Sequence, residues 1–205
     1  NPKDRKILFH CLGMALFSNA IPFSLLSYAQ ILVSSGFAGI AMAIVPLFVL
    51  PLTHFLVPNQ RMTPPKVYGF FIGFIGVVVL IGPSSLDIGK NNQIVMAQIA
   101  CVIASSCYAL GAIVTKLTPK VSLISFTACS LLIASLIMIP IAIFFEGIPK
   151  FNGYIPIFGV LYLGLFPTAL ATILKVSLIR RAGPAFLSLV NYQVPIWAVL
   201  IGALI

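Results

Sequence analysis

The amino-acid sequence alternates between long apolar runs and short polar connections. Seven runs come close to or exceed the length of about 20 residues that an α-helix needs to cross a bilayer. No period-two alternation, which would indicate a membrane β-barrel, runs through them. We therefore expect an all-α integral membrane protein whose backbone groups are satisfied within helices. The seven predicted transmembrane helices are residues 7–28, 36–57, 66–83, 94–115, 122–145, 155–178 and 184–205.

Composition agrees with this pattern. About 60% of the residues are hydrophobic, 7% are charged, and the mean hydropathy is +1.15. A soluble domain carries roughly a quarter charged residues, so this inventory cannot cover a water-facing surface. The connections hold the proline, glycine and polar residues that end helices.

The cysteines offer no metal chemistry. All four lie inside apolar runs, and their spacing matches no metal site. No glycine-rich phosphate-binding loop precedes a helix either. We therefore expect no cofactor, and free thiols at Cys11, Cys101, Cys107 and Cys129.

The basic residues are divided unequally between the two sides of the predicted helices. Ten of the twelve Lys and Arg belong to one side, and only Lys90 and Lys150 belong to the other. Because cytoplasmic loops collect positive charge, we expect residue 1 on the cytoplasmic side of a bacterial inner or plasma membrane. Nucleic-acid binding is not expected, since the basic residues form no single patch. We expect Lys175 to snorkel to the cytoplasmic surface.

Two stretches of the sequence repeat a pattern in opposite orientations. They are SSGFAGIAMAIVPLFVL (34–50) and RAGPAFLSLVNYQVPIWAVL (181–200). Each has a glycine at a loop–helix junction, an alanine two residues later and a proline within the helix. By the charge distribution the first helix runs inward and the second outward, and such inverted repeats with interrupted helices are typical of transporters. The matched pairs are Gly36 and Gly183, Ala38 and Ala185, and, with two extra residues in the second copy, Pro46 and Pro195.

These junctions, together with LVNYQVPIWAVLIGAL (189–204) and YGFFIGFIGVVVLIG (68–82), resemble the EamA family of the drug/metabolite transporter superfamily. The resemblance implies ten helices in two five-helix halves of inverted topology. Residues 1–83 then look like the last three helices of the first half, 84–92 like an extracytoplasmic linker, and 93–205 like the first four helices of the second half. The chain is thus expected to be a fragment that lacks two helices in front and one behind.

The resemblance also implies a central cavity, lined in part by the proline-bearing helices of Pro46 and Pro195. Polar residues near prolines point to the same place, because proline frees a backbone carbonyl that a water- or substrate-facing interior tolerates and lipid does not. On a helical wheel Asn191 shares a face with Pro195. Tyr108 lies mid-helix together with Ser105. The substrate-path candidates are Asn19, Pro22, Pro46, Tyr108, Thr168, Asn191, Tyr192 and Pro195.

The alternative for each candidate is a structural kink or an interhelical hydrogen bond, worth about 0.6 kcal/mol. A further set, Gly69, Gly73 and Gly76, places small residues on one helix face and predicts a close packing seam. That seam packs within the bundle or, alternatively, in a homodimer. His10 and His54 are expected at the membrane interface, with a proton relay as the alternative.

The leading functional hypothesis is a secondary transporter, most simply an exporter, of a small metabolite such as an amino acid, working by alternating access. Two other classes stay open: a membrane-embedded enzyme, and a receptor. An enzyme requires a nucleophile–base pair or paired acids at membrane depth. The three acids, Asp4, Asp87 and Glu146, all fall in the connections, so none of the seven predicted helices supplies an intramembrane carboxylate for proton coupling. Whether the missing helices supply one or proton coupling is absent stays open.

Overall fold

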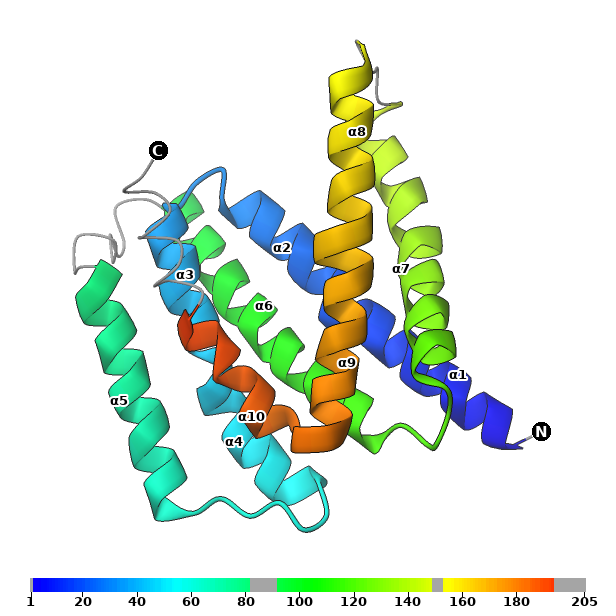
Figure 1. Ribbon diagram of the computed structural model, residues 1–205. Coiled ribbons are helices and arrows are strands. Elements are labelled where there is room, and N and C mark those ends of the chain that lie inside the picture. Colours follow the sequence, from blue (N-terminus) through cyan, green and yellow to red (C-terminus); the bar gives the residue numbers. More distant parts are fainter. Residues whose placement is uncertain (1, 82–91, 149–152, 194–205) are drawn as a thin grey trace.

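The computed structural model describes residues 2–81, 92–148 and 153–193, and every regular element in these ranges is helical (Figure 1). Three of the long helices are interrupted and therefore carry two or three labels. The elements are α1 (Pro2–Ala15), the π-helical turn η1 (Leu16–Ala20), α2 (Ile21–Ala29), α3 (Ser35–Ala43), α4 (Val45–Leu56), α5 (Pro64–Ile81), α6 (Asn92–Leu117), α7 (Leu123–Glu146), α8 (Tyr154–Leu163), the π-helical turn η3 (Gly164–Leu170), α9 (Ala171–Ala182) and α10 (Pro184–Ser188).

Within the described residues, five helices are long and apolar enough to cross a membrane when the parts of an interrupted helix are counted together, and each overlaps one predicted run. The run at 66–83 coincides with α5, whose apolar described part, Pro64–Val79, is shorter. The run at 184–205 is described only as far as residue 193. The all-α membrane fold is therefore confirmed, while the count of seven helices stays a prediction. The five helices are Lys3–Ala29, Ser35–Leu56, Asn92–Leu117, Leu123–Glu146 and Tyr154–Ala182.

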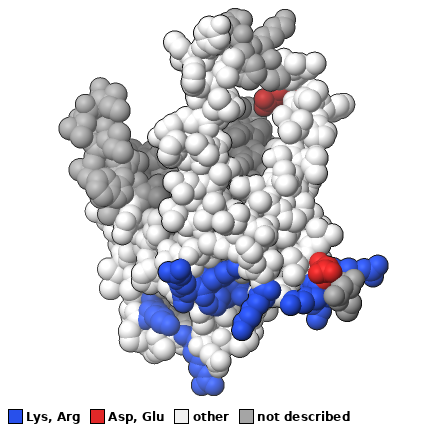
Figure 2. All heavy atoms as spheres, turned by 45° about the vertical axis from the view of Figure 1, so that its right-hand side comes forward, with Lys and Arg blue, Asp and Glu red and all other residues white. Residues whose placement is uncertain are grey.

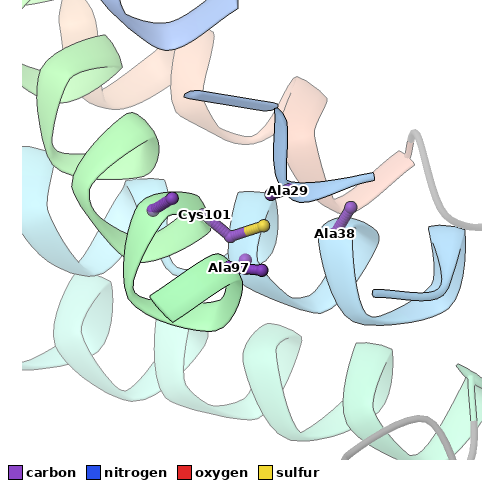
Figure 3. Packing of buried hydrophobic residues seen from close by; sticks show 6 residues of the cluster. Ala29, Ala38, Ala97 and Cys101 are labelled. Carbon is purple, nitrogen blue, oxygen red and sulfur yellow. The ribbon is translucent and has the colours of Figure 1, made fainter. Parts of the chain in front are cut away.

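Helix α6 occupies the middle of the bundle, with α1, η1, α2, α3 and α4 packed against it (Figure 1). Small side chains allow these backbones to approach closely, as membrane helices commonly do. Around the crossing of α2, α3 and α6 the buried cluster consists of alanines and one cysteine; Figure 3 shows Ala29, Ala38, Ala97 and Cys101 converging there. The predicted free state of the four cysteines agrees with the structure.

Gly111 of α6 marks a close approach between α6 and η1. A Cβ added there would lie 3.1 Å from the carbonyl carbon of Phe17 and would also strike the hydroxyl of Ser18. Any larger residue would force the helices apart. Glycine is therefore required at this position by the packing of η1 on α6.

Helices α7 and α8 bury little of their surface. Phe144, Phe145 and Ile155 are each about four-fifths exposed, and α8 contains no buried residue. A soluble protein rarely leaves so large an apolar surface in water, so this exterior suits the hydrocarbon of a bilayer.

The described Lys and Arg residues gather at one end of the molecule. Figure 2 shows the Lys and Arg atoms of this face in a belt at the lower end, below a long wall without Lys or Arg. Such segregation is what the unequal distribution in the sequence predicts. In Figure 1, α3 begins at the upper end and α10 at the lower end, so the two glycine-led helices start at opposite ends of the bundle.

Candidate functional site

A cavity of about 440 Å³ lies where α4, α6, α9 and α10 meet. Its wall is mostly aliphatic, with five polar or charged residues. It falls within the range of about 300–1,000 Å³ that is usual for small-molecule sites. The lining residues are Ser18, Met42, Val45, Val49, Tyr108, Ala112, Ala171, Leu174, Lys175, Leu178, Pro184, Leu187, Ser188, Val190 and Asn191.

Gly183 sets the direction of the helix that closes this cavity. Its φ of +96° reverses the chain between α9 and α10, a conformation that L-residues with side chains rarely adopt. The side chain of Gln60, in the loop after α4, lies over this junction, and a Cβ on Gly183 would be 2.5 Å from Gln60 Nε2. The turn returns the chain along α9, so Pro184, Leu187 and Asn191 reach the cavity.

Two substrate-path candidates, Tyr108 and Asn191, line the cavity. Tyr108 comes from α6, and its ring stands edge-on to Phe23 at a centroid distance of 6.4 Å. Asn191 lies on the helical turn that follows α10. The structure thus brings together two residues 83 positions apart in the sequence.

Asn19 and Thr168 instead hydrogen-bond within their own helices. Asn19 is buried, and its Nδ2 donates to the Met14 carbonyl at 3.3 Å. Thr168 Oγ1 donates to the Leu163 carbonyl at 2.9 Å, which is the carbonyl that Pro167 leaves without its usual donor. Neither side chain is part of the cavity wall among the described residues, although Ser18, next to Asn19, is.

Pro22 and Pro46 shape the helices around the cavity without lining it. Both are almost completely buried. Pro46 lies in the first turn of α4, where a missing N–H costs least. At the break before it the Ala41 carbonyl accepts from Ile44 N–H at 3.1 Å and from Ser105 Oγ at 2.6 Å, so Ser105 bridges α6 to this joint.

Tyr192 points away from its neighbour Asn191, toward α5. Its hydroxyl donates to the Phe70 carbonyl at 2.6 Å, and its ring covers Gly73, where an added Cβ would lie 2.8 Å from Tyr192 Cε2. Successive helical residues differ by about 100° in direction, which explains why one lines the cavity and the next packs against a helix. Pro195, the remaining candidate, lies outside the described residues.

Of the three glycines in the predicted packing seam, one contacts a side chain from another helix. Gly73 meets Tyr192, as described above. A Cβ at Gly69 or Gly76 would meet no described atom within 4 Å. Whether these two open glycines face a second copy of the chain stays a prediction.

The side chain of Lys175 lies in a different place from the one that the sequence predicts. It was expected to snorkel to the surface, but its side chain lies in the cavity wall together with Leu174 and Leu178. Its depth was the available signal: it precedes Gly183 by eight residues, about two helical turns inside the apolar run. Ser188 is also in the wall, and its hydroxyl is satisfied by the Ala185 carbonyl at 2.8 Å.

Comparison with known proteins places these features in a family. The family model described as the EamA-like transporter family matches residues 1–82 and 95–205. A solved crystal structure superposes on this chain with a TM-score of 0.76 and 22% sequence identity, over 95% of this chain and 66% of the other. At that identity the likeness concerns the fold alone.

Three curated relatives extend the comparison. An "Uncharacterized transporter" of Archaeoglobus fulgidus is 26% identical over 76% of this chain and 54% of its own length. "Uncharacterized transporter YoaV" of Bacillus subtilis is 22% identical over 92% of this chain and 64% of its own. "Protein PecM" of Dickeya dadantii is 26% identical over 89% of this chain and 60% of its own. The chain thus spans less than two thirds of these relatives. Because the family model matches nearly the whole chain, the protein belongs to the EamA-like transporter family.

Proposed function

We propose that this protein is a secondary transporter that exports a small metabolite, such as an amino acid, by alternating access. The observation that carries the proposal is the position of the cavity. Its wall combines Ser18, Met42 and Val49 from the first matched segment with Tyr108 and Asn191 from the second. A site shared between two repeats is where inverted-repeat transporters bind their substrates.

The wall indicates how such a compound is bound. Aliphatic side chains, among them Val45, Leu174 and Leu187, supply most of it and would cover an apolar body. Tyr108 and Asn191 supply hydroxyl and amide groups that can orient a polar end. A largely apolar wall with a few polar groups is the usual composition of a small-molecule site.

An interrupted helix supports the alternating-access mechanism. The α3–α4 joint at Ile44 borders the cavity, and so does the turn at Gly183 between the successive helices α9 and α10. Interrupted helices let one bundle rock against another around a fixed central site. We place residue 1 and the Lys- and Arg-rich end on the cytoplasmic side of a bacterial inner or plasma membrane, within a ten-helix whole.

Transport by the full-length protein in proteoliposomes tests the proposal. A panel of radiolabelled amino acids and related metabolites is offered on either side of the membrane, and transported compounds are identified against protein-free vesicles. Ala112→Trp, which fills the cavity, should reduce the initial rate about tenfold or more. Leu132→Trp, on the exposed face of α7, is the matched control and should leave the rate unchanged.

Two results would contradict the proposal. If no compound in the panel moves across the membrane, the protein is not a carrier of this class. If Ala112→Trp transports as well as the unmodified protein and Leu132→Trp, the carrier uses a path other than this cavity.

A further inference from the structure

The cavity contains one positively charged side chain, and it has no partner among the described residues. Lys175 makes no hydrogen bond or ion pair there. Other basic residues of the same region are bound: Lys116 Nζ donates to the Arg180 carbonyl at 2.9 Å. Arg180 Nη1 in turn donates to the Val121 carbonyl at 2.8 Å, with its guanidinium 5.2 Å from the centre of the Phe126 ring.

No described acid can neutralise Lys175. The cavity wall contains neither Asp nor Glu. Glu146 ends α7, and Asp4 lies in the first turn of α1. An unpaired ammonium group in an apolar, membrane-embedded wall is unfavourable, so such residues usually mark sites where ions or substrates bind.

The chemistry of lysine restricts the kinds of ligand that can bind in the cavity. Its ammonium group offers three donors and no acceptor, so the group that it binds must accept hydrogen bonds and carry negative charge. A single lysine without a second cation in the wall fits one negative charge. The surrounding Leu174, Leu178 and Leu187 fit an apolar body attached to that charge.

We propose that Lys175 anchors the carboxylate of the transported compound, which makes the substrate class a small carboxylate with an apolar body. This inference rests on the proposed transport function. Tyr108 and Asn191, on α6 and after α10, face the same cavity from other helices and bind the remaining polar group of the substrate. An amino acid satisfies this description when its ammonium group donates to the oxygen of either residue.

Ligand-induced thermal stabilisation of the purified full-length protein tests the anchor without a transport assay. The probes are 3-phenylpropanoate, 4-methylpentanoate, phenylalanine and leucine, each compared with its primary amide; inorganic phosphate is a separate probe. Three variants accompany the unmodified protein. Lys175→Met removes the charge, Lys175→Arg keeps it, and Lys120→Met removes an exposed charge from the α6–α7 loop.

The carboxylates should stabilise the unmodified protein, Lys175→Arg and Lys120→Met, and their amides should not. In Lys175→Met the apparent Kd for the best carboxylate should rise about tenfold or more, since a hydrogen bond to a charged group is worth that much. A melting temperature without ligand at or above that of the unmodified protein verifies that Lys175→Met is folded.

Three outcomes would overturn the anchor: equal binding of acids and amides, carboxylate binding that survives Lys175→Met, or stabilisation by phosphate alone. These outcomes are distinguishable from failure of the transport function. If Lys175→Met transports carboxylates at the normal rate, the carrier stands and the anchor falls. If carboxylates bind through Lys175 but nothing crosses proteoliposomes, the site stands and the carrier falls.

Discussion

Two helices of this protein are interrupted by similar π-helical turns but differ in how much of each turn is buried. The helix α1–η1–α2 contains a π-helical turn just before Pro22, and α8–η3–α9 contains one around Pro167. In each, a side chain bonds the carbonyl five residues earlier: Asn19 that of Met14, and Thr168 that of Leu163. In Figure 1 the two helices run in opposite directions.

Their surroundings differ. Ser18, Asn19 and Ala20 of η1 are buried against α6, whereas η3 has no buried residue. The break is therefore a local property of proline and a nearby polar side chain, which forms with or without neighbours. Burial depends on tertiary packing, and it determines how much the free energy of unfolding falls when each π-helical turn is altered.

The largest expected difference concerns the glycines beside the two turns. Gly111→Val should destabilise the protein by about 3 kcal/mol, because the new side chain meets the Phe17 backbone and Ser18. Gly164→Val, in η3, meets nothing described within 4 Å and should have little effect. Chemical unfolding in detergent micelles measures both. Equal losses in the two variants would show that η1 is no more constrained than η3.

A smaller effect is expected at the buried turn itself. Asn19→Leu keeps the approximate shape but removes the donor to the Met14 carbonyl in a buried setting. The loss should be about 1 kcal/mol, within the range for polar contacts in membrane proteins. The same unfolding measurement applies, with Asn19→Gln as the variant that retains an amide. No loss in Asn19→Leu would mean that the hydrogen bond does not stabilise the turn.

The smallest effect is expected at the exposed turn. Thr168→Val removes only the hydroxyl that bonds Leu163, and should cost about 0.6 kcal/mol or less. Ser135→Ala, which removes a comparable hydroxyl from the Leu131 carbonyl on α7, is the reference, because Leu131 is not the carbonyl that Pro140 of the same helix leaves without a donor. If Thr168→Val proves more destabilising than Asn19→Leu, burial does not determine which of the two π-helical turns is more sensitive to substitution.

Much of the fold follows from local patterns. Run length predicts the long helices because each must span the same hydrocarbon thickness. The joint at Gly183 follows from a glycine between a basic helix end and a proline. Prolines also accompany the interruptions near Pro22, Pro46 and Pro167, whereas α4 and α7 continue through Pro51 and Pro140.

The cavity could be predicted only in part, because side-chain direction depends on how helices pack. Asn191 and Tyr192 are adjacent and equally polar in sequence, yet one lines the cavity and the other bonds Phe70. Lys175 was misplaced for the same reason. Its long side chain permits both snorkelling and facing inward; its depth in the run favours the inward direction, and the positions of α4, α6 and α10 determine the outcome.

The Ser105 hydroxyl has two possible hydrogen-bond acceptors near the α3–α4 joint. Its hydroxyl carries one proton and lies 2.6 Å from the Ala41 carbonyl and 3.0 Å from that of Cys101. If the joint straightens, Val45 N–H becomes the regular helical donor to Ala41, and the hydroxyl turns to Cys101. The Ala41 carbonyl thus has a donor in either form, Ser105 and Ile44 in the bent one and Val45 in the straight one, so the helix can flex at this point without leaving that carbonyl unbonded.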